Sequence, residues 1–284
     1  MPPSPRVSQS PAVQPIRAAN GVALVTVPEW QNLPWLWHGF STRRGGVTPI
    51  YSVSGEDELN LGFTADDNRD NVLRNRRLLA EAVTGDASTP LATIRQVHSA
   101  VIALVGPDSP SQPACEGDGL MTSQPGILIG IQTADCVPVL VADPRRKAVA
   151  AFHAGWRGTV KRIVENGIAR MTHEFGSQPH DLVAAIGPAI GPCCYTVGED
   201  LLSEFQSQFA GAGELFHQSA ADSTLHLDLF EANRRQLLDA GLAPQSITLA
   251  GGCTACHPDL FFSHRASHGK AGRMLSVIGI APSR

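Results

Sequence analysis

The sequence predicts an α/β fold in which mixed β-sheets are layered with helices. Strand-like and helix-like segments alternate irregularly, and several predicted strands follow one another with no helix between them. A regular parallel array would alternate one strand with one helix throughout. The 284 residues, of which 43% are hydrophobic, are enough for one large core. We therefore expect a flexible Pro- and Ser-rich tail over residues 1–21 and a single domain over residues 22–284.

Short apolar runs bounded by turn residues predict strands along the whole chain. In order, the strands are expected at residues 22–27, 35–42, 91–98, 101–105, 147–153, 182–186, 247–250 and 274–280. The runs 91–98 and 101–105 are expected to pair with each other. Residues 126–142 are almost continuously apolar except at 132–136, which predicts a buried strand, a functional turn and a second buried strand.

Helices are predicted where apolar residues recur with a period near 3.6. The expected helices cover residues 67–83, 159–175, 199–209 and 228–240. Gly85 and Gly241 follow two of them and suit the end of a helix, because glycine adopts the left-handed conformation required there. Asp228 suits the N-terminal cap of the last one.

The composition excludes several classes of function. A formal net charge of −4, with no block of Lys and Arg, argues against a nucleic-acid partner. No apolar run is long enough to predict a membrane span, and the first residues lack the apolar core of a secretory signal. We expect a cytoplasmic protein whose six cysteines act as ligands, nucleophiles or core residues rather than in disulfides.

Three segments carry the residues with the most chemical potential: Arg95–His98, Thr133–Pro138 and Phe152–Gly158. Each lies where an apolar run meets small or polar residues. Together they offer two imidazoles and one thiolate, from His98, His153 and Cys136. This set suits a zinc site with one open coordination position, and it equally suits a Cys–His nucleophile pair.

Asp135, beside Cys136, could orient a ligand, act as general base or bind substrate. The alternative for the whole set is a buried cysteine and two hydrogen-bonded core histidines, since free cysteine is often buried. Because all three stand beside turn-forming Gly, Pro or Ala residues, we favour a functional site.

Other motifs are less specific. Cys253–Cys256 is a CxxC motif followed by His257, and it could bind zinc or cycle as a dithiol. No second CxxC completes a structural zinc site, and the adjacent Cys193 and Cys194 cannot easily bridge each other. Gly187–Pro192 is interpreted as a rigid turn that shapes a pocket wall, because its prolines remove amide donors. The polar loop over residues 106–118 is interpreted as functional.

Several cations could hold an anion, or could simply be surface arginines; they are Arg43, Arg44, Arg157 and Arg265. Gly45, Gly46 and Gly158 would let a ligand approach the backbone beside them. Residues 261–265 combine two phenylalanines with polar groups, which suits a nucleobase, although core packing explains the phenylalanines equally well.

These motifs together resemble the multicopper polyphenol oxidase (laccase-domain) family, which includes the peptidoglycan editing factor and purine nucleoside phosphorylases. The resemblance covers residues 22–280 in conserved order. It rests on Gln96–His98, Thr133–Pro138, His153–Gly158, Phe40–Arg43 with Gly45–Val47, Asn60–Gly62, Gly187–Gly191, Val197–Gly198, Cys253–Thr254, Phe261–Arg265 and Gly272–Met274.

The resemblance implies a fold related to bacterial toxin deamidases with a Cys–His pair. It implies zinc held by His98, Cys136 and His153, with Cys136, His153 and Asp135 as catalytic residues. Substrate and phosphate would be bound by Arg43, Asn60, Gln96, Arg157 and Arg265. The implied reactions are phosphorolysis of adenosine, inosine, guanosine or methylthioadenosine to base and ribose-1-phosphate, and deamination of adenosine.

Alternative activities remain open. Some members are described as removing a misincorporated L-serine from a UDP-MurNAc peptide precursor in the cell wall, and Cys136 with His153 could do so without metal. A binding protein without turnover is a third class. Copper-dependent phenol oxidation fits poorly, since none of the ten histidines forms the His-x-His motifs of such copper sites, although copper could still bind a Cys/His site.

Overall fold

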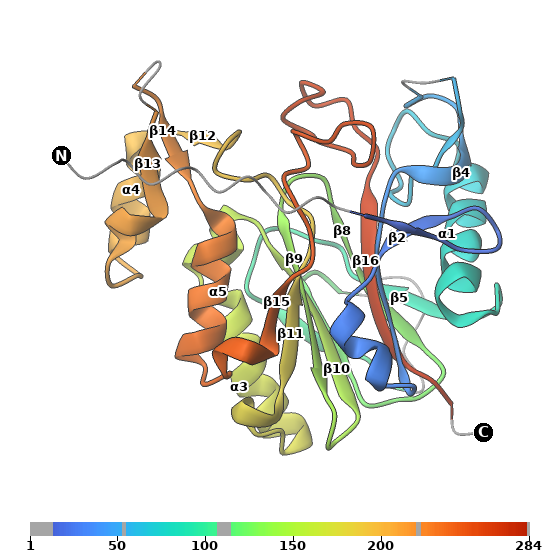
Figure 1. Cartoon of the computed structure of the whole chain (residues 1–284), viewed down its shortest axis with the longest axis horizontal. Coiled ribbons are helices and arrows are strands. Elements are labelled where there is room, and N and C mark those ends of the chain that lie inside the picture. The colour runs from blue at the N-terminus through green and yellow to red at the C-terminus, as the bar shows by residue number, and fades with distance from the viewer. Residues whose placement is uncertain (1–13, 53–54, 107–114, 220–222, 283–284) are drawn as a thin grey trace.

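The computed structural model describes residues 14–52, 55–106, 115–219 and 223–282, which form four layers (Figure 1). Helix α1 (Arg69–Thr84) covers one six-stranded sheet, and that sheet packs against a second six-stranded sheet. Helices α3 (Ile163–Phe175) and α5 (Leu229–Asp239) cover the outer face of the second sheet. The predicted mixed α/β architecture is therefore confirmed.

The first sheet has the strand order β1-β2-β3-β16-β8-β5. Its strands are β1 (Ile16–Arg17), β2 (Ala23–Val25), β3 (Leu36–Ser41), β16 (Met274–Ile280), β8 (Leu128–Thr133) and β5 (Leu91–Thr93). All neighbours are antiparallel except β5 and β8, which are parallel. Strand β16 is buried along its whole length, since α1 covers one face of the sheet and the second sheet covers the other.

The second sheet has the order β15-β11-β9-β10-β7-β6. Its strands are β15 (Ile247–Leu249), β11 (Val183–Ile186), β9 (Val137–Asp143), β10 (Ala148–Ala154), β7 (Gly119–Thr122) and β6 (Ile102–Leu104). The two edge pairs, β11 with β15 and β6 with β7, are parallel, and the inner pairs are antiparallel.

Strands β9 and β10 form the centre of the core. Alternate side chains point to opposite faces of a strand, so Val139 and Val141 pack toward the helices while Leu140 and Ala142 pack toward the first sheet. Both faces are covered, which explains why these strands read as nearly continuous apolar runs.

Glycine allows the closest helix contact with the second sheet. A Cβ atom at Gly167 of α3 would lie 2.2 Å from the ring of Phe152 in β10, so a larger residue would push the helix off the sheet. The predicted caps are also present: Asp228 accepts a hydrogen bond from the Glu231 amide, and Gly85 adopts a left-handed φ of 84°.

The remaining elements surround the two large sheets. A small third sheet has the order β12-β14-β13. These elements are β4 (Arg44–Thr48), α2 (Trp156–Val160), β12 (Thr196–Val197), α4 (Glu199–Gln206), β13 (Phe216–Gln218), β14 (Leu225–Leu227) and the 3₁₀ helices Pro28–Asn32, Pro179–Asp181, Ala212–Leu215 and Pro244–Ser246. Across the described ranges, every helix is too short or too polar to cross a bilayer.

Two predictions about the elements were wrong. The runs 91–98 and 101–105 do not pair, because β5 joins β8 in the first sheet whereas β6 joins β7 in the second, and the chain crosses between the sheets in the segment that carries His98. The single helix predicted over 159–175 is split into α2 and α3. Arg162 interrupts it with a left-handed φ of 55°, and its guanidinium is held by Glu165 and Asp239.

Regular structure is found within the segment predicted as a tail. Part of the expected tail forms β1, which pairs with β2, and the Asn20 side chain donates to the Leu78 carbonyl and to Glu81 of helix α1. Residues 1–13 of that tail, and residues 107–114 of the polar loop, lie outside the described residues.

The partly buried imidazole of His38 generates a testable pH dependence of stability. Its Nε2 accepts a hydrogen bond of 3.0 Å from the Val27 amide, and burial lowers its pKa from 6.5 to about 4. Because the folded state favours the neutral ring, the stabilisation is complete above pH 6.5 and is lost as the pH falls toward 4. We expect His38→Gln, which keeps an acceptor, to reduce this acid loss by up to about 3 kcal/mol.

The measurement is the free energy of unfolding by urea at several values from pH 7 to pH 4. His180→Gln is the matched control, because the His180 side chain is 70% exposed. If the free energy of unfolding of His38→Gln fell between pH 7 and pH 4 as much as that of the wild type, the acid loss would not arise from His38.

Candidate functional site

The three predicted ligands lie together. Their ligand atoms, from His98, Cys136 and His153, are all within 4.8 Å of one another. The Cys136 Sγ is 4.0 Å from His98 Nε2, and the two imidazole rings are 5.0 Å apart at an interplanar angle of 71°. A Cβ at Gly155 would lie 2.9 Å from the sulfur and 3.1 Å from His98 Cδ2, so glycine keeps the space between the ligands free.

This donor set fits a metal ion. One thiolate and two imidazoles are the ligands preferred by Zn²⁺ and copper, and three protein ligands leave a position open for water or substrate. The His153 Nδ1 is already hydrogen-bonded to the Asp118 carboxylate at 2.8 Å, so its Nε2 is the nitrogen that faces the site. Such a carboxylate contact on the far side of a histidine is typical of metal ligands.

Asp118 is the main positioning residue of the site, and sequence reasoning missed it. Its fully buried carboxylate accepts hydrogen bonds from the amides of Val97, His98 and Ser99, from the Ser99 hydroxyl and from His153. It therefore fixes the backbone of one ligand and the ring of another. The available signal was an Asp between two glycines, Gly117 and Gly119, in the segment between two ligand motifs.

The electrostatics favour an ion pair between thiolate and imidazolium in the absence of metal. Burial alone would raise the pKa of Cys136, but the neighbouring His153 and His98 lower it to about 6. Burial alone would lower the pKa of His153, but Cys136 and Asp118 raise it to about 9. Burial likewise raises the pKa of Asp118, and the hydrogen bonds from His153 and Ser99 outweigh it and lower the pKa to about 2.

Asp135 ties three loops together beside Cys136. Its carboxylate accepts from the Thr254 hydroxyl at 2.6 Å and from the Arg265 amide at 2.7 Å, and its carbonyl accepts from the Ile190 amide at 2.8 Å. Its φ of 92° is rare outside glycine. The structure thus shows a positioning role, and its role as general base stays a prediction.

Gln96 also positions a ligand segment. Its side-chain amide donates to the Gln132 carbonyl and its oxygen accepts from the Gln132 amide, both at 2.7 Å. These two bonds hold the His98 segment against the end of β8, three residues before Asp135. Both side-chain groups of Gln96 are therefore engaged within the protein.

Two exposed arginines, Arg157 and Arg265, lie near Tyr195. The charges of Arg265 and Arg157, together with those of Cys136 and Asp135, act on the Tyr195 hydroxyl. Burial and the negative charge of Cys136 raise the pKa of Tyr195 to about 12, so it remains a hydrogen-bond donor. The Arg265 guanidinium lies 5.3 Å from the Tyr195 ring and donates to the Thr196 carbonyl. Tyr195 was not predicted.

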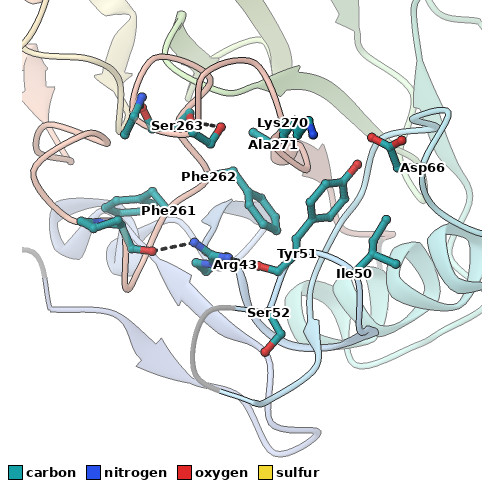
Figure 2. A pocket seen from close by; sticks show the side chains of 13 residues that line it. Arg43, Ile50, Tyr51, Ser52, Asp66, Phe261, Phe262, Ser263, Lys270 and Ala271 are labelled. Atoms are coloured by element: carbon teal, nitrogen blue, oxygen red, sulfur yellow. Dashed lines mark hydrogen bonds between the residues drawn. The ribbon is translucent and has the colours of Figure 1, made fainter.

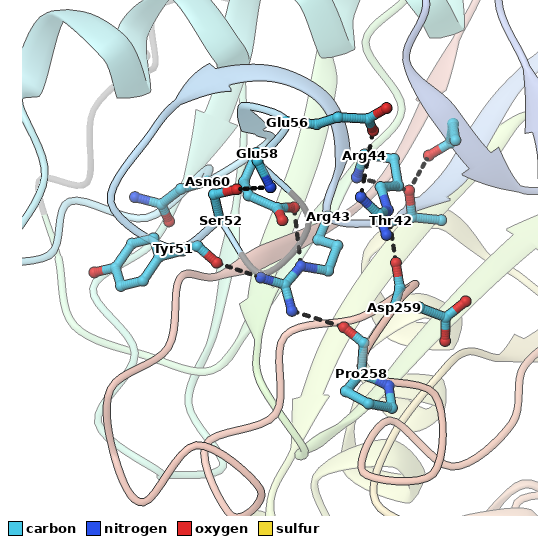
Figure 3. A network of polar contacts seen from close by, with 12 residues as sticks. Thr42, Arg43, Arg44, Tyr51, Ser52, Glu56, Glu58, Asn60, Pro258 and Asp259 are labelled. Carbon is cyan, nitrogen blue, oxygen red and sulfur yellow. Dashed lines mark hydrogen bonds and ion pairs between the residues drawn. The ribbon is translucent and has the colours of Figure 1, made fainter.

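Arg43 and Asn60 have structural contacts instead. Arg43 is buried, pairs with the fully buried Glu58 at 2.9 Å and donates to the carbonyls of Tyr51 and Pro258 (Figure 3). Asn60 is also fully buried, and its side chain bonds Asp67 and the backbones of Gly62 and Arg273. Their roles in binding substrate or phosphate stay predictions.

A cavity of about 520 Å³ lies beside Arg43, not at the ligand cluster (Figure 2). Its wall includes Tyr51, Phe261, Phe262 and Ser263. Its volume alone does not make this cavity the reactive centre, because His98, Cys136 and His153 do not line it. The two regions share one segment: Phe261 and Phe262 are buried in the core between the sheets, and the amide of Arg265 a few residues later binds Asp135.

Comparison with known proteins identifies the family of this chain. Residues 37–281 match the protein family described as multi-copper polyphenol oxidoreductase laccase. The chain is 35% identical over 249 residues to purine nucleoside phosphorylase YlmD of Bacillus subtilis, covering 85% of this chain and 87% of that protein. It is 34% identical over 246 residues to adenosine deaminase RL5 from an unknown prokaryotic organism, covering 84% and 92%.

A solved structure has the same fold. The crystal structure of YlmD from Geobacillus stearothermophilus superposes with a TM-score of 0.81 at 34% identity, covering 94% of this chain and 98% of that chain.

The hydrogen bonds of Asp118 generate a prediction about metal affinity. In Asp118→Asn the amide nitrogen cannot accept, so His153 and the His98 backbone lose their common anchor. We expect metal binding to weaken roughly 10–100-fold, measured by competition with a chelator on protein whose circular dichroism is unchanged. Asp143→Asn is the control, because Asp143 is equally buried and bonds the amides of Arg145 and Arg146. Equal weakening in both variants would contradict a specific role.

Proposed function

This chain belongs to the multi-copper polyphenol oxidoreductase laccase family, and we propose that it is a zinc-dependent purine nucleoside phosphorylase that also deaminates adenosine. The observation that carries the proposal is the convergence of His98, Cys136 and His153 within 4.8 Å, beside exposed arginines. The relatives include a purine nucleoside phosphorylase and an adenosine deaminase, and their names support both activities.

The three ligand side chains would hold the metal through one sulfur and two nitrogens. Zinc suits this set because it accepts mixed sulfur and nitrogen ligands in a tetrahedral site with one open position. When bound, zinc supplies a Lewis acid that polarises a substrate atom or acidifies a water molecule. Copper accepts similar ligands, but the chain lacks the paired His-x-His motifs of multicopper oxidases.

Phosphorolysis needs an anion held against the sugar. A phosphate oxygen forms a bond to C1′ of the ribose, the C1′–N9 bond breaks, and its electron pair leaves with the purine, which takes up a proton. Arg157 and Arg265 are exposed cations whose charges reach the site, so they are the groups that would hold the phosphate. The Tyr195 hydroxyl, with its raised pKa, would donate a hydrogen bond to phosphate or purine.

Asp135 would organise this anion site rather than contact the phosphate. Its carboxylate accepts a hydrogen bond from the Arg265 backbone amide and thereby fixes the position of the Arg265 backbone. Its bond to Thr254 and the bond from Ile190 to its carbonyl hold the neighbouring loops at a fixed distance from Cys136. A substitution here is therefore expected to affect phosphate binding through position, not through direct contact.

A metal-free amidase is the second candidate, and one observation favours it. Cys136, His153 and Asp118 form a chain in which the aspartate orients the imidazole and the imidazole lowers the pKa of the thiol. This is the arrangement of an activated cysteine nucleophile with a base oriented by a third group. A cell-wall peptide precursor would be the substrate of such an enzyme.

Metal analysis of the purified protein and of Cys136→Ala separates the two candidates. We expect the variant to lose the metal of this cluster together with ribose-1-phosphate formation from adenosine or inosine and phosphate, because a ligand is removed. Cys115→Ala, which changes an exposed cysteine, is the control. A wild-type cluster without metal, in a protein that cleaves an amide and stops when Cys136 is changed, would replace the phosphorylase with the amidase.

The arginines can be tested by phosphate dependence. We expect Arg157→Gln and Arg265→Gln each to raise the KM for phosphate roughly tenfold or more, since a hydrogen bond to a charged group contributes about 1.5–3 kcal/mol. Initial rates at varied phosphate and fixed nucleoside measure this. Arg145→Gln, at a side chain that is 74% exposed, should leave the KM unchanged. A lowered kcat at unchanged phosphate KM would assign the arginines to another step.

A further inference from the structure

Four further cysteines gather outside the site described above. Although the chain has a single CxxC motif, the fold brings the adjacent Cys193 and Cys194 to it, so that the ligand atoms of these two residues and of Cys253 and Cys256 all lie within 4.8 Å of one another. Sequence reasoning missed this set, because the two pairs are about sixty residues apart and only one of them has the familiar spacing.

The sheet topology explains the encounter. Strands β11 and β15 are parallel neighbours, so their C-terminal ends lie at the same edge of the second sheet. The chain continues from β11 to Cys193 and Cys194, and from β15 to Cys253 and Cys256 (Figure 1). The two connections touch closely: a Cβ at Gly251 would lie 2.4 Å from the Pro188 nitrogen.

The distances suit a shared ion better than a disulfide. The Cys256 sulfur is 3.5 Å from the Cys193 sulfur and 3.4 Å from the Cys194 sulfur, whereas a disulfide needs about 2.05 Å. All four thiols are free. With a zinc–sulfur bond of about 2.3 Å, neighbouring corners of a tetrahedron are about 3.8 Å apart, and small side-chain adjustments reach that spacing.

A backbone amide supports the most buried sulfur. Gly191 donates its amide hydrogen to Cys253 Sγ at 3.2 Å, and Cys253 is fully buried. Outer contacts of this kind orient thiolate ligands in metal sites.

We propose that Cys193, Cys194, Cys253 and Cys256 bind a second, structural zinc ion that clamps the two connections together. Binding would deprotonate the four thiols, release their protons to solvent and form four zinc–sulfur bonds, with no change in oxidation state. This inference does not depend on the proposed phosphorylase activity, because the four ligands are separate from His98, Cys136 and His153.

The clamp would also stabilise the neighbouring site. Thr254, next to Cys253, donates to Asp135, and Ile190 of the other connection donates to the Asp135 carbonyl. Tyr195 directly follows Cys194. Holding the two pairs of cysteines together therefore fixes three groups beside Cys136, while the clamp itself stays outside the reaction.

The test is zinc stoichiometry in protein purified without chelator. Since the described residues contain two such clusters, we expect about two zinc ions in the wild type and in Cys115→Ser, and about one in Cys136→Ser and in Cys256→Ser. Cobalt loaded into Cys136→Ser should give the strong thiolate-to-cobalt charge-transfer absorption of a four-sulfur site, and this absorption should be lost in Cys136→Ser/Cys256→Ser.

Thiol titration on the wild type keeps the proposal testable if Cys256→Ser does not fold. A chelator should make the four cysteines reactive and lower the melting temperature, and added zinc should reverse both changes. Cys136→Ser protein without metal, whether its four thiols are freely reactive or joined in disulfides, would overturn the proposal. A wild-type protein that binds both zinc ions but shows no phosphorylase activity would count against the proposed function alone.

Discussion

The buried carboxylate of Asp118 is the contact on which the geometry of the ligand cluster depends. A charged group without water is costly unless every lone pair is matched by a donor. Here the donors come from the backbone of residues 97–99, from the Ser99 hydroxyl and from the ring of His153. The Asp118 carboxylate therefore joins the loop that carries His98 to strand β10, which carries His153. If either moved away, the carboxylate would lose hydrogen-bond donors.

The two stacked sheets explain why the ligands meet. Both His98 and Cys136 lie where the chain crosses from the first sheet to the second, one between β5 and β6 and the other between β8 and β9. His153 lies near the end of β10, which pairs with β9. A segment that crosses between the sheets forms no strand hydrogen bonds in either sheet, so it can adopt rare backbone dihedral angles. His98 and Asp135, in the two crossing segments, both have a positive φ. The strain is held by the core on either side.

The sequence predicted those parts of the structure that depend on local pattern. The candidate ligands His98, Cys136 and His153, the long helix α1 and the strand β16 could all be found from motif or periodicity. What was missed depends on pairing across long separations. The sheets to which β5 and β6 belong, the role of Asp118 and the meeting of Cys194 with Cys256 are set by topology, which no short window of residues contains.

The position of Arg43 shows the same limit for a single residue. Its motif suggested an anion-binding cation, yet the fold places the buried Glu58 and two carbonyl groups around its guanidinium. A sequence motif can identify an arginine that is able to bind an anion. Only the fold shows whether that guanidinium is buried against groups of the protein or is exposed to a ligand. Arg157 and Arg265 have less distinctive contexts but stay exposed near the cluster.

The central place of β16 has a consequence for synthesis of the protein. This last described strand lies between β3 and β8, so without it the first sheet exists only as two halves, β1-β2-β3 and β8-β5. At ordinary translation rates the gap between β8 and β16 takes on the order of ten seconds to make. During that time the growing chain presents two open strand edges, which readily pair with other chains. The nascent polypeptide is thus more exposed to pairing with other chains than the finished fold is.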